Sequence, residues 1–180
     1  MKKILALTGE TGAGKDTFCE YAQKTFPLTF SFRFSDPLFE VLKIFFEEIK
    51  KQDQQWLATA LRARFGNNIL GEVIIKKIKK INEGLIIVNG IRMLEELELV
   101  KRLGGKIVYI TAVPKIRWQR IQKRGEKKDD NVSFEKFLEI EEAPTEILIS
   151  QVGQKADFKI ENNGSKESFY QKVEKIINKL

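Results

Sequence analysis

The segment from Gly9 to Thr17 constrains the fold of this chain more than any other. It reads Gly-Glu-Thr-Gly-Ala-Gly-Lys-Asp-Thr, and it follows Lys3–Thr8, an apolar run short enough for a buried strand. From Gly14 to about Thr25 the apolar residues recur with a helical period. A glycine-rich loop with a lysine, placed between a strand and a helix, is typical of sites that hold phosphate groups.

The main chain of this loop is expected to bind the phosphates. Glycines permit backbone conformations that turn successive N–H groups toward one point. The helix that follows presents free N–H groups and the positive end of its dipole to the same anion. Lys15 adds a mobile positive charge for the β- and γ-phosphates. We predict that the phosphates of ATP or a similar nucleotide are held by Gly9, Gly12, Ala13, Gly14, Lys15, Asp16 and Thr17.

Two positions depart from the usual phosphate-loop pattern. The residue after the lysine is normally Ser or Thr, whose hydroxyl binds Mg²⁺, but here it is Asp16, with Thr17 next. The apolar run Leu85–Val88 ends in Asn89, where an aspartate often anchors the metal through water. A carboxylate can hold Mg²⁺ directly or through water. We predict metal ligands at Asp16 and Thr17; either Asp16 supplies the charge that Asn89 lacks, or metal binding is weak.

Predicted strands and helices alternate along the whole chain. This alternation indicates one α/β domain over residues 1–180, with a mostly parallel sheet and helices on both faces. The predicted strands are Lys3–Thr8, Leu28–Phe34, Leu85–Val88, Lys106–Thr111 and Phe158–Glu161. The predicted helices are Gly14–Thr25, Asp36–Lys50, Gln54–Arg64, Asn68–Ile81, Met93–Leu103, Pro114–Arg124, Phe134–Ser150 with a break or kink at Pro144, and Lys166–Leu180. Residues 35–82 hold more helix than one crossover requires, so we expect an insertion there, and a second excursion at about 120–145.

The composition excludes several classes of function. The chain has 180 residues, no histidine and one cysteine, Cys19. Without histidine, neither His-based acid–base chemistry nor His-ligated zinc is possible, and Cys19 is expected to be a packing residue. The net charge is +7, but Lys and Glu are mixed along most helices, as on solvated faces, so we expect no nucleic-acid partner.

The apolar runs of the chain are all short. None approaches the roughly 20 residues that span a bilayer. The run at the N-terminus is also too short for a signal peptide, and it stops at a polar loop instead of a cleavage site of small residues. We therefore expect no membrane association and a cytoplasmic location.

Asp36 and Arg92 follow predicted strands and are candidates for handling an acceptor. Ligands of open parallel sheets bind at the carboxyl ends of the strands. Asp36 could orient or deprotonate an acceptor there, or it could share helix capping with Ser35. The guanidinium of Arg92 suits a bidentate grip on a phosphate. Other candidates on this side, each of which could instead be a surface residue, are Arg33, Arg62 and Arg64.

A third group of arginines lies on the predicted helix Pro114–Arg124. Arg117, Arg120 and Arg124 lead into a charged loop over residues 125–131, and Arg120 and Arg124, four residues apart, share one face of the helix. Arginines carried by a closing loop can neutralise the charge of a phosphoryl group in transfer. We therefore expect this group to belong to a lid. The predicted catalytic residues are Lys15, Asp16, Asp36, Arg92, Arg120 and Arg124.

The order of these features resembles the P-loop nucleoside monophosphate kinases over nearly the whole chain. Arg120–Arg124 reads Arg-Ile-Gln-Lys-Arg, which is similar to the Arg-Ile-x-x-Arg of adenylate kinase-like proteins. In those proteins one arginine lies near the donor base and another contacts the phosphates. The resemblance therefore implies both roles for Arg120 and Arg124, and an α/β fold of the adenylate kinase type: a three-layer P-loop NTPase fold with a five-stranded parallel sheet, a helical acceptor-binding insertion and a short lid.

Two narrower resemblances compete. Gly14–Thr17, Asp36–Leu38 and Asn89–Arg92 look like deoxynucleoside monophosphate kinases and related archaeal adenylate kinase-like proteins. Ala156–Ser165 looks like dephospho-CoA kinase, although the same ending also occurs in the first group. In this superfamily the loop after the last strand borders the donor base, which implies a role for Asn162 and Gly164.

The resemblance implies a kinase that uses ATP and Mg²⁺ in nucleotide metabolism. The predicted reaction transfers the γ-phosphate of ATP to a ribo- or deoxyribonucleoside monophosphate. The alternatives are a dephospho-CoA kinase, in which Asp36 would act as base on a hydroxyl, and a nucleotide-binding regulator with little turnover, which Asn89 suggests. The expected partner is a small phosphorylated acceptor, and the expected state is a monomer or a homodimer.

Overall fold

The computed structural model describes residues 1–125, 132–142 and 144–180. Within these residues five strands form one parallel sheet, in the order β2-β3-β1-β4-β5. The strands are β1 (Lys2–Thr8), β2 (Thr29–Arg33), β3 (Gly84–Asn89), β4 (Lys106–Thr111) and β5 (Phe158–Glu161). The predicted α/β fold with a five-stranded parallel sheet is confirmed.

The helices follow the predicted order. They are α1 (Lys15–Thr25), α2 (Asp36–Phe45), α3 (Lys51–Phe65), α4 (Ile69–Lys79), α5 (Leu94–Arg102), α6 (Pro114–Arg124), α7 (Phe134–Glu141), α8 (Pro144–Gln154) and α9 (Lys166–Ile177). The charged loop predicted after α6 lies, for residues 126–131, outside the described residues. Among the described parts of the chain, no helix has both the length and the apolar character needed to cross a membrane.

One helix ends well before its predicted boundary, and another is broken at a proline. The helix expected to reach Lys50 ends at Phe45, and Phe46 already has an extended backbone. Glu47 and Glu48 would have placed two negative charges at the negative end of a longer helix. The break predicted at Pro144 is confirmed: the segment from Phe134 forms two helices, and Pro144 begins the second one. At the first position of a helix the missing N–H of proline costs no hydrogen bond.

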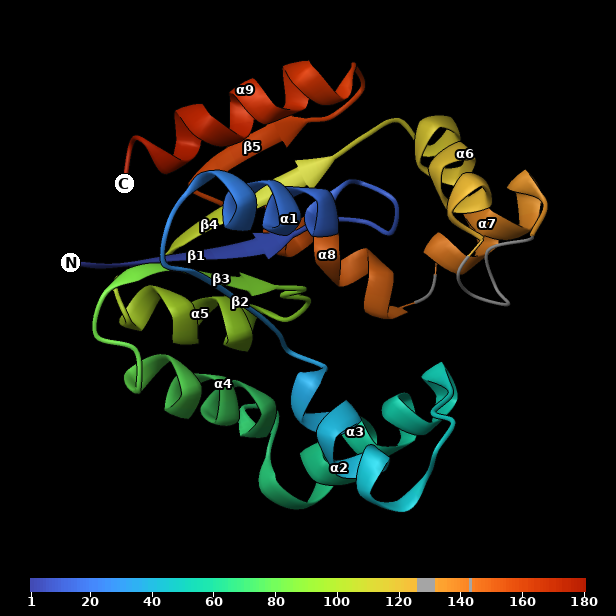
Figure 1. Ribbon diagram of the computed structural model, residues 1–180. Coiled ribbons are helices and arrows are strands. Elements are labelled where there is room, and N and C mark those ends of the chain that lie inside the picture. The colour runs from blue at the N-terminus through green and yellow to red at the C-terminus, as the bar shows by residue number, and fades with distance from the viewer. Residues whose placement is uncertain (126–131, 143) are drawn as a thin grey trace.

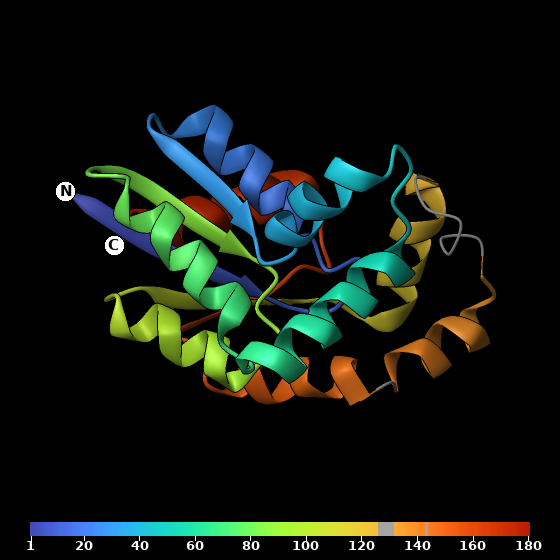
Figure 2. The ribbon, with the colours of Figure 1, turned by 90° about the horizontal axis from the view of Figure 1, so that it is seen from below.

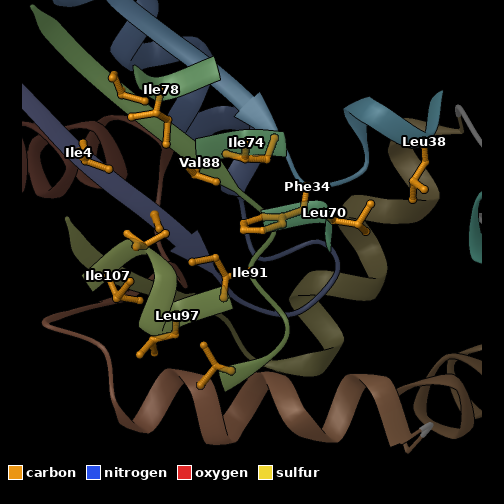
Figure 3. Packing of buried hydrophobic residues seen from close by; sticks show 14 of the residues in the cluster. Ile4, Phe34, Leu38, Leu70, Ile74, Ile78, Val88, Ile91, Leu97 and Ile107 are labelled. Carbon is orange, nitrogen blue, oxygen red and sulfur yellow. The ribbon is translucent and has the colours of Figure 1, made fainter. Parts of the chain in front are cut away.

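The sheet separates two hydrophobic layers. Along β1, Ile4 and Ala6 pack on one face, and Leu5 and Leu7 pack on the other, as the twofold period of a strand requires. The first face is covered by α4, α5 and α8, and the second by α1 and α9 (Figure 1). Figure 3 shows part of the first layer, with Ile74 and Ile78 of α4 and Leu97 of α5 near the sheet.

Cys19 lies in the second layer. It is buried between α1 and the sheet, as expected for a packing residue, and burial raises the pKa of its thiol to about 11.

The predicted insertion divides into two parts. Helix α4 packs on the sheet through Leu70, Ile74 and Ile78, whereas α2 and α3 extend beyond the carboxyl ends of the strands. Helices α6 and α7 extend from the same end of the sheet, and the chain termini lie at the opposite end (Figures 1 and 2). The boundaries of an insertion at 35–82 and a lid at 120–145 stay predictions.

The loop that leaves β1 passes very close to β4. Gly9 has φ +148°, and a Cβ at this position would overlap the carbonyl oxygen of Ile110. Because main-chain atoms of a sheet strand cannot move aside cheaply, only glycine allows this approach. The contact sets the direction in which the loop starts.

We predict that Gly9→Ala destabilises the protein more than Gly104→Ala, measured by urea unfolding. Gly104 also has a positive φ, +75°, but a Cβ there meets no described atom within 4 Å. Gly104→Ala should therefore cost only the backbone strain, about 1–3 kcal/mol. Gly9→Ala adds the overlap with Ile110, so its loss should be clearly larger. Equal losses for the two variants would contradict this account of the Gly9 contact.

Candidate active site

The glycine-rich loop joins β1 to the start of α1. Gly12 has φ +80° and Gly14, the N-cap of α1, has φ +113°. The ammonium group of Lys15 donates to the carbonyl oxygens of Gly9 at 2.6 Å and Glu10 at 3.0 Å. The lysine thus closes the loop into a ring at the positive end of the helix. This geometry is suited to holding a phosphate.

A pocket of about 360 Å³ opens above this loop. Most of the predicted site residues line it: Gly12, Gly14, Lys15, Asp16, Thr17, Arg120, Arg124, Asn162 and Gly164. Four predicted residues are not among its lining residues: Gly9, Ala13, Asp36 and Arg92. Gly9 and Ala13 belong to the loop but are buried, so their part is to shape it. The pocket therefore brings together the phosphate loop, the arginines of α6 and the segment after β5.

Arg120 and Arg124 reach this pocket from α6. The Nη2 of Arg120 donates to the carbonyl oxygen of Asn162 at 2.9 Å, which holds the side chain against the segment after β5. Its Nη1 is buried and has no hydrogen-bond partner among the described residues. Burial lowers the pKa of the Arg120 guanidinium. The Nη1 of Arg120 is thus available to an anionic ligand in the pocket.

Asn162 supports the loop directly. Its side-chain Nδ2 donates to the carbonyl oxygen of Ala13 at 2.9 Å, and its main-chain N–H donates to Thr111 at 2.7 Å. The residue is buried, and its amide lies so close to Gly14 that a Cβ on that glycine would be 2.6 Å away. The resemblance to kinases implies that Asn162 lies near the donor base, which stays a prediction; its contacts add a role in holding the phosphate loop.

Asp16 and Asn89, the two departures from the usual pattern, contact each other. The Oδ1 of Asp16 accepts from the Nδ2 of Asn89 at 2.9 Å and from the Nη2 of Arg33 at 2.8 Å. Arg33 also lines the pocket. The carboxylate in the loop therefore lies beside the amide at the end of β3.

Asp16 and Thr17 fit a hydrated magnesium ion. Both described hydrogen bonds of Asp16 use Oδ1, which leaves Oδ2, and Thr17 lines the same pocket. Mg²⁺ usually keeps several waters and takes only one or two carboxylates together with phosphate oxygens. No cluster of three or more His, Cys, Asp or Glu side chains suited to a metal occurs in residues 1–125, 132–142 and 144–180. Such a cluster is not needed for an ion that nucleotide phosphates bring with them.

Asp36 and Arg92 lie outside the pocket lining. The Oδ2 of Asp36 accepts from the main-chain N–H of Arg33 at 2.7 Å, so this carboxylate fixes the turn between β2 and α2. Arg92 follows β3 and is exposed, and its main-chain N–H donates to the Oε2 of Glu96 at 2.9 Å. The two candidates therefore flank the site on the side of α2 and α5.

Sequence reasoning missed Glu96. This carboxylate is 1% exposed, and burial raises its pKa. It accepts from the main-chain N–H groups of Arg92 and Met93 and from the Nη2 of Arg62 at 3.2 Å. It thus ties α3 to the start of α5. A glutamate three residues into a helix is a signal for a capping box, but the pairing with Arg62 is not visible in the sequence.

Arg117 has a different position from the other arginines of α6. It is 4% exposed, its Nε donates to the carbonyl oxygen of Ala112 at 2.8 Å, and its Nη2 donates to Glu141 of α7 at 2.8 Å. Its Nη1 lies 3.5 Å from the carbonyl oxygen of Thr11 in the loop. Arg117 therefore joins the loop to α7, and the lid role expected for the arginines of α6 stays a prediction.

Tyr109 also supports the loop from β4. Its hydroxyl donates to the carboxylate of Glu10. Burial, together with this hydrogen bond, raises the pKa of Tyr109 to about 12, so the hydroxyl keeps its proton near neutral pH. The side chain of Glu10 is thus directed to β4, and sequence reasoning did not assign it a role.

We predict that Asn162→Asp weakens both folding and ATP binding. A carboxylate oxygen would face the carbonyl oxygen of Ala13, so a donor–acceptor contact becomes a repulsion at a buried position. The free energy of unfolding should fall by about 1–3 kcal/mol, measured by urea unfolding, and calorimetric ATP affinity should fall with it. Asn163→Asp is the control, because its Oδ1 accepts from the N–H of Val113 and an aspartate keeps that bond. Equal effects would contradict a specific role for the Asn162 amide.

Known proteins are similar to this chain in sequence. A family model described as "AAA domain" matches residues 5–145. The UPF0200 protein of Sulfurisphaera tokodaii is 28% identical over 180 residues, which are 99% of this chain and 97% of that protein.

Two solved structures of kinases align over nearly their whole length. Shikimate kinase from Bacteroides thetaiotaomicron has a TM-score of 0.67 at 15% identity, with 98% of each chain covered. Dephospho-CoA kinase from Campylobacter jejuni has a TM-score of 0.52 at 20% identity, with 99% of this chain and 96% of that one covered. The predicted relationship to P-loop kinases is confirmed at the level of the fold. This chain belongs to the AAA domain family and has the fold of the P-loop kinases.

Proposed function

We propose that this protein is an ATP-dependent kinase whose acceptor is a ribo- or deoxyribonucleoside monophosphate. The observation that carries the proposal is the pocket that the phosphate loop shares with Arg120 and Arg124. A loop that only binds a nucleotide needs no second group of cations. Arginines beside the phosphate loop suit a reaction in which negative charge spreads over a transferred phosphoryl group.

The positions of the donor-side residues support the following roles. Lys15 and the loop N–H groups hold the donor phosphates, and Asn162 and Gly164 border the donor base. Asp16 and Thr17 hold Mg²⁺, which when bound would neutralise part of the phosphate charge. Arg120 and Arg124 stabilise the charge on the transferred group. Catalysis on this scheme consists mainly of positioning and electrostatics.

The chemical step forms one bond and breaks one. A phosphate oxygen of the acceptor bonds to the γ-phosphorus, and the bond from that phosphorus to the β–γ bridging oxygen breaks. The products are ADP and a nucleoside diphosphate. Because the attacking oxygen is already anionic, no strong base is required. Arg92 would contact the acceptor phosphate from its position after β3.

We expect ADP release that depends on a monophosphate, measured by a coupled assay. The panel should contain all common ribo- and deoxyribonucleoside monophosphates, together with dephospho-CoA and shikimate. Arg124→Ala should lower kcat by about 10³-fold or more, since arginines in this role contribute that much, and Lys15→Ala should also lose activity. Arg102→Met, at an exposed arginine in the last turn of α5, is the control and should keep the wild-type rate.

If every acceptor leaves the ADP rate at background while ATP binds, the kinase proposal is wrong. That result would instead support a nucleotide-binding regulator, as the amide at Asn89 suggests.

Asp36→Asn should separate a phosphate acceptor from a hydroxyl acceptor such as dephospho-CoA. A hydroxyl must lose a proton, so a base in the position of Asp36 would be essential, and kcat would fall by about 10²–10⁴-fold without it. A phosphate acceptor needs no such base. The amide oxygen that this substitution introduces can still accept from the Arg33 N–H, so on our proposal the loss should be less than about tenfold. A near-complete loss would favour the hydroxyl acceptor.

A further inference from the structure

Arg33 lies near Asn89 and Asp16 at the carboxyl ends of the central strands. The ladder between β2 and β3 places Arg33 opposite Asn89, and the ladder between β3 and β1 places Asn89 opposite Leu7. The first turn of α1 then brings Asp16 over the same point, where its Oδ1 accepts from both Arg33 and Asn89. Side chains from three separate segments of the chain, β2, β3 and α1, therefore meet at the Oδ1 of Asp16.

The main chain of Arg33 is fixed as well. Its N–H donates to the carboxylate of Asp36 at 2.7 Å, so the residue is held at its backbone by α2 and at its side chain by α1. The side chains of Arg33 and Asp16 are nevertheless 58% and 53% exposed. Ion pairs this exposed add little to stability. What the contacts do achieve is a defined position for the guanidinium at the edge of the phosphate pocket.

The guanidinium of Arg33 keeps donors for a ligand. Its one described side-chain hydrogen bond uses Nη2, which leaves the Nε and Nη1 hydrogens. A planar fork of N–H groups matches two oxygens of a phosphate. Arg33 approaches the pocket from β2, next to α2, whereas Arg120 and Arg124 approach it from α6. Cations from these two elements therefore line one pocket.

We propose that Arg33 binds the phosphate of the acceptor, and that Asp16, Asn89 and Asp36 hold it in position. This inference rests on the proposed kinase function and adds a specificity residue to it. It also accounts for both departures in the sequence. An aspartate after the loop lysine offers Arg33 a negatively charged oxygen, whereas the hydroxyl of a serine is neutral. An asparagine at the end of β3 can donate to that aspartate, whereas a second carboxylate would repel it.

The test compares Arg33→Met with Arg33→Lys and with the control Arg102→Met, using the monophosphate that gives wild type its highest kcat/KM. Arg33→Met should raise the KM for this acceptor by about 10–100-fold, the effect of losing a charge-assisted hydrogen-bond pair. The KM for ATP should change by less than about threefold. Arg33→Lys keeps the charge but not the fork, so its acceptor KM should lie between wild type and Arg33→Met.

A second measurement tests the role of Asp16. In a double-mutant cycle on the acceptor KM, Asp16→Asn should have a smaller effect in the Arg33→Met background than in wild type, because its partner is already gone. Independent effects would contradict the idea that Asp16 acts through Arg33. The ATP affinity of each variant, measured by calorimetry, separates this effect from any change at the metal.

The outcomes distinguish the two proposals. If wild type releases ADP with a monophosphate, and the acceptor KM of Arg33→Met matches that of Arg102→Met, the role of Arg33 is refuted and the kinase function stands. If no monophosphate supports ADP release by wild type, the proposed function fails and this inference fails with it. If Arg33→Met does not fold, Arg33→Lys is the deciding variant. An acceptor KM above that of wild type supports the role of Arg33, and an equal KM refutes it.

Discussion

The site depends on the close approach of Gly9 to the main chain of Ile110. The loop leaves β1 against a neighbouring strand, where there is room for a backbone but not for a side chain. From there Lys15 closes the loop onto Gly9 and Glu10, and the Asn162 amide holds Ala13. Each support comes from a different element, so the loop is a property of the whole sheet. The arginines of α6 line the same pocket as this supported loop.

Most of the fold could be predicted because its signals are local. A parallel sheet needs helices between its strands, and the apolar runs at Lys106–Thr111 and Phe158–Glu161 match β4 and β5 residue for residue. The helix predicted to reach Lys50 is wrong at its end, because the hydrophobic pattern continues past Phe45 while the charges of the residues that follow do not favour a helix. The break at Pro144 could be predicted from the proline itself.

The site was predictable to the extent that it is a motif. The loop and the spacing of Arg120 and Arg124 are contiguous in sequence, and both line the pocket. The contacts that orient them are not contiguous: Asp16 meets Asn89 across 73 positions, and Arg62 meets Glu96 across 34. The position of Arg117 could not be predicted either, although it shares a helix with Arg120 and Arg124. Its burial against Glu141 depends on where α7 lies. Residue type and spacing indicate which side chains are available, whereas strand register and helix packing decide which of them meet.

The buried position of Cys19 has a practical consequence. A protonated, inaccessible thiol reacts slowly with maleimides and similar reagents. Since the chain contains no other cysteine, new cysteines on α3 and α7 would be the reactive ones, and the native residue could stay in place. A donor and an acceptor dye on these two helices, which both extend beyond the carboxyl ends of the strands (Figure 1), would follow the distance between them, one molecule at a time, as nucleotide and acceptor are added.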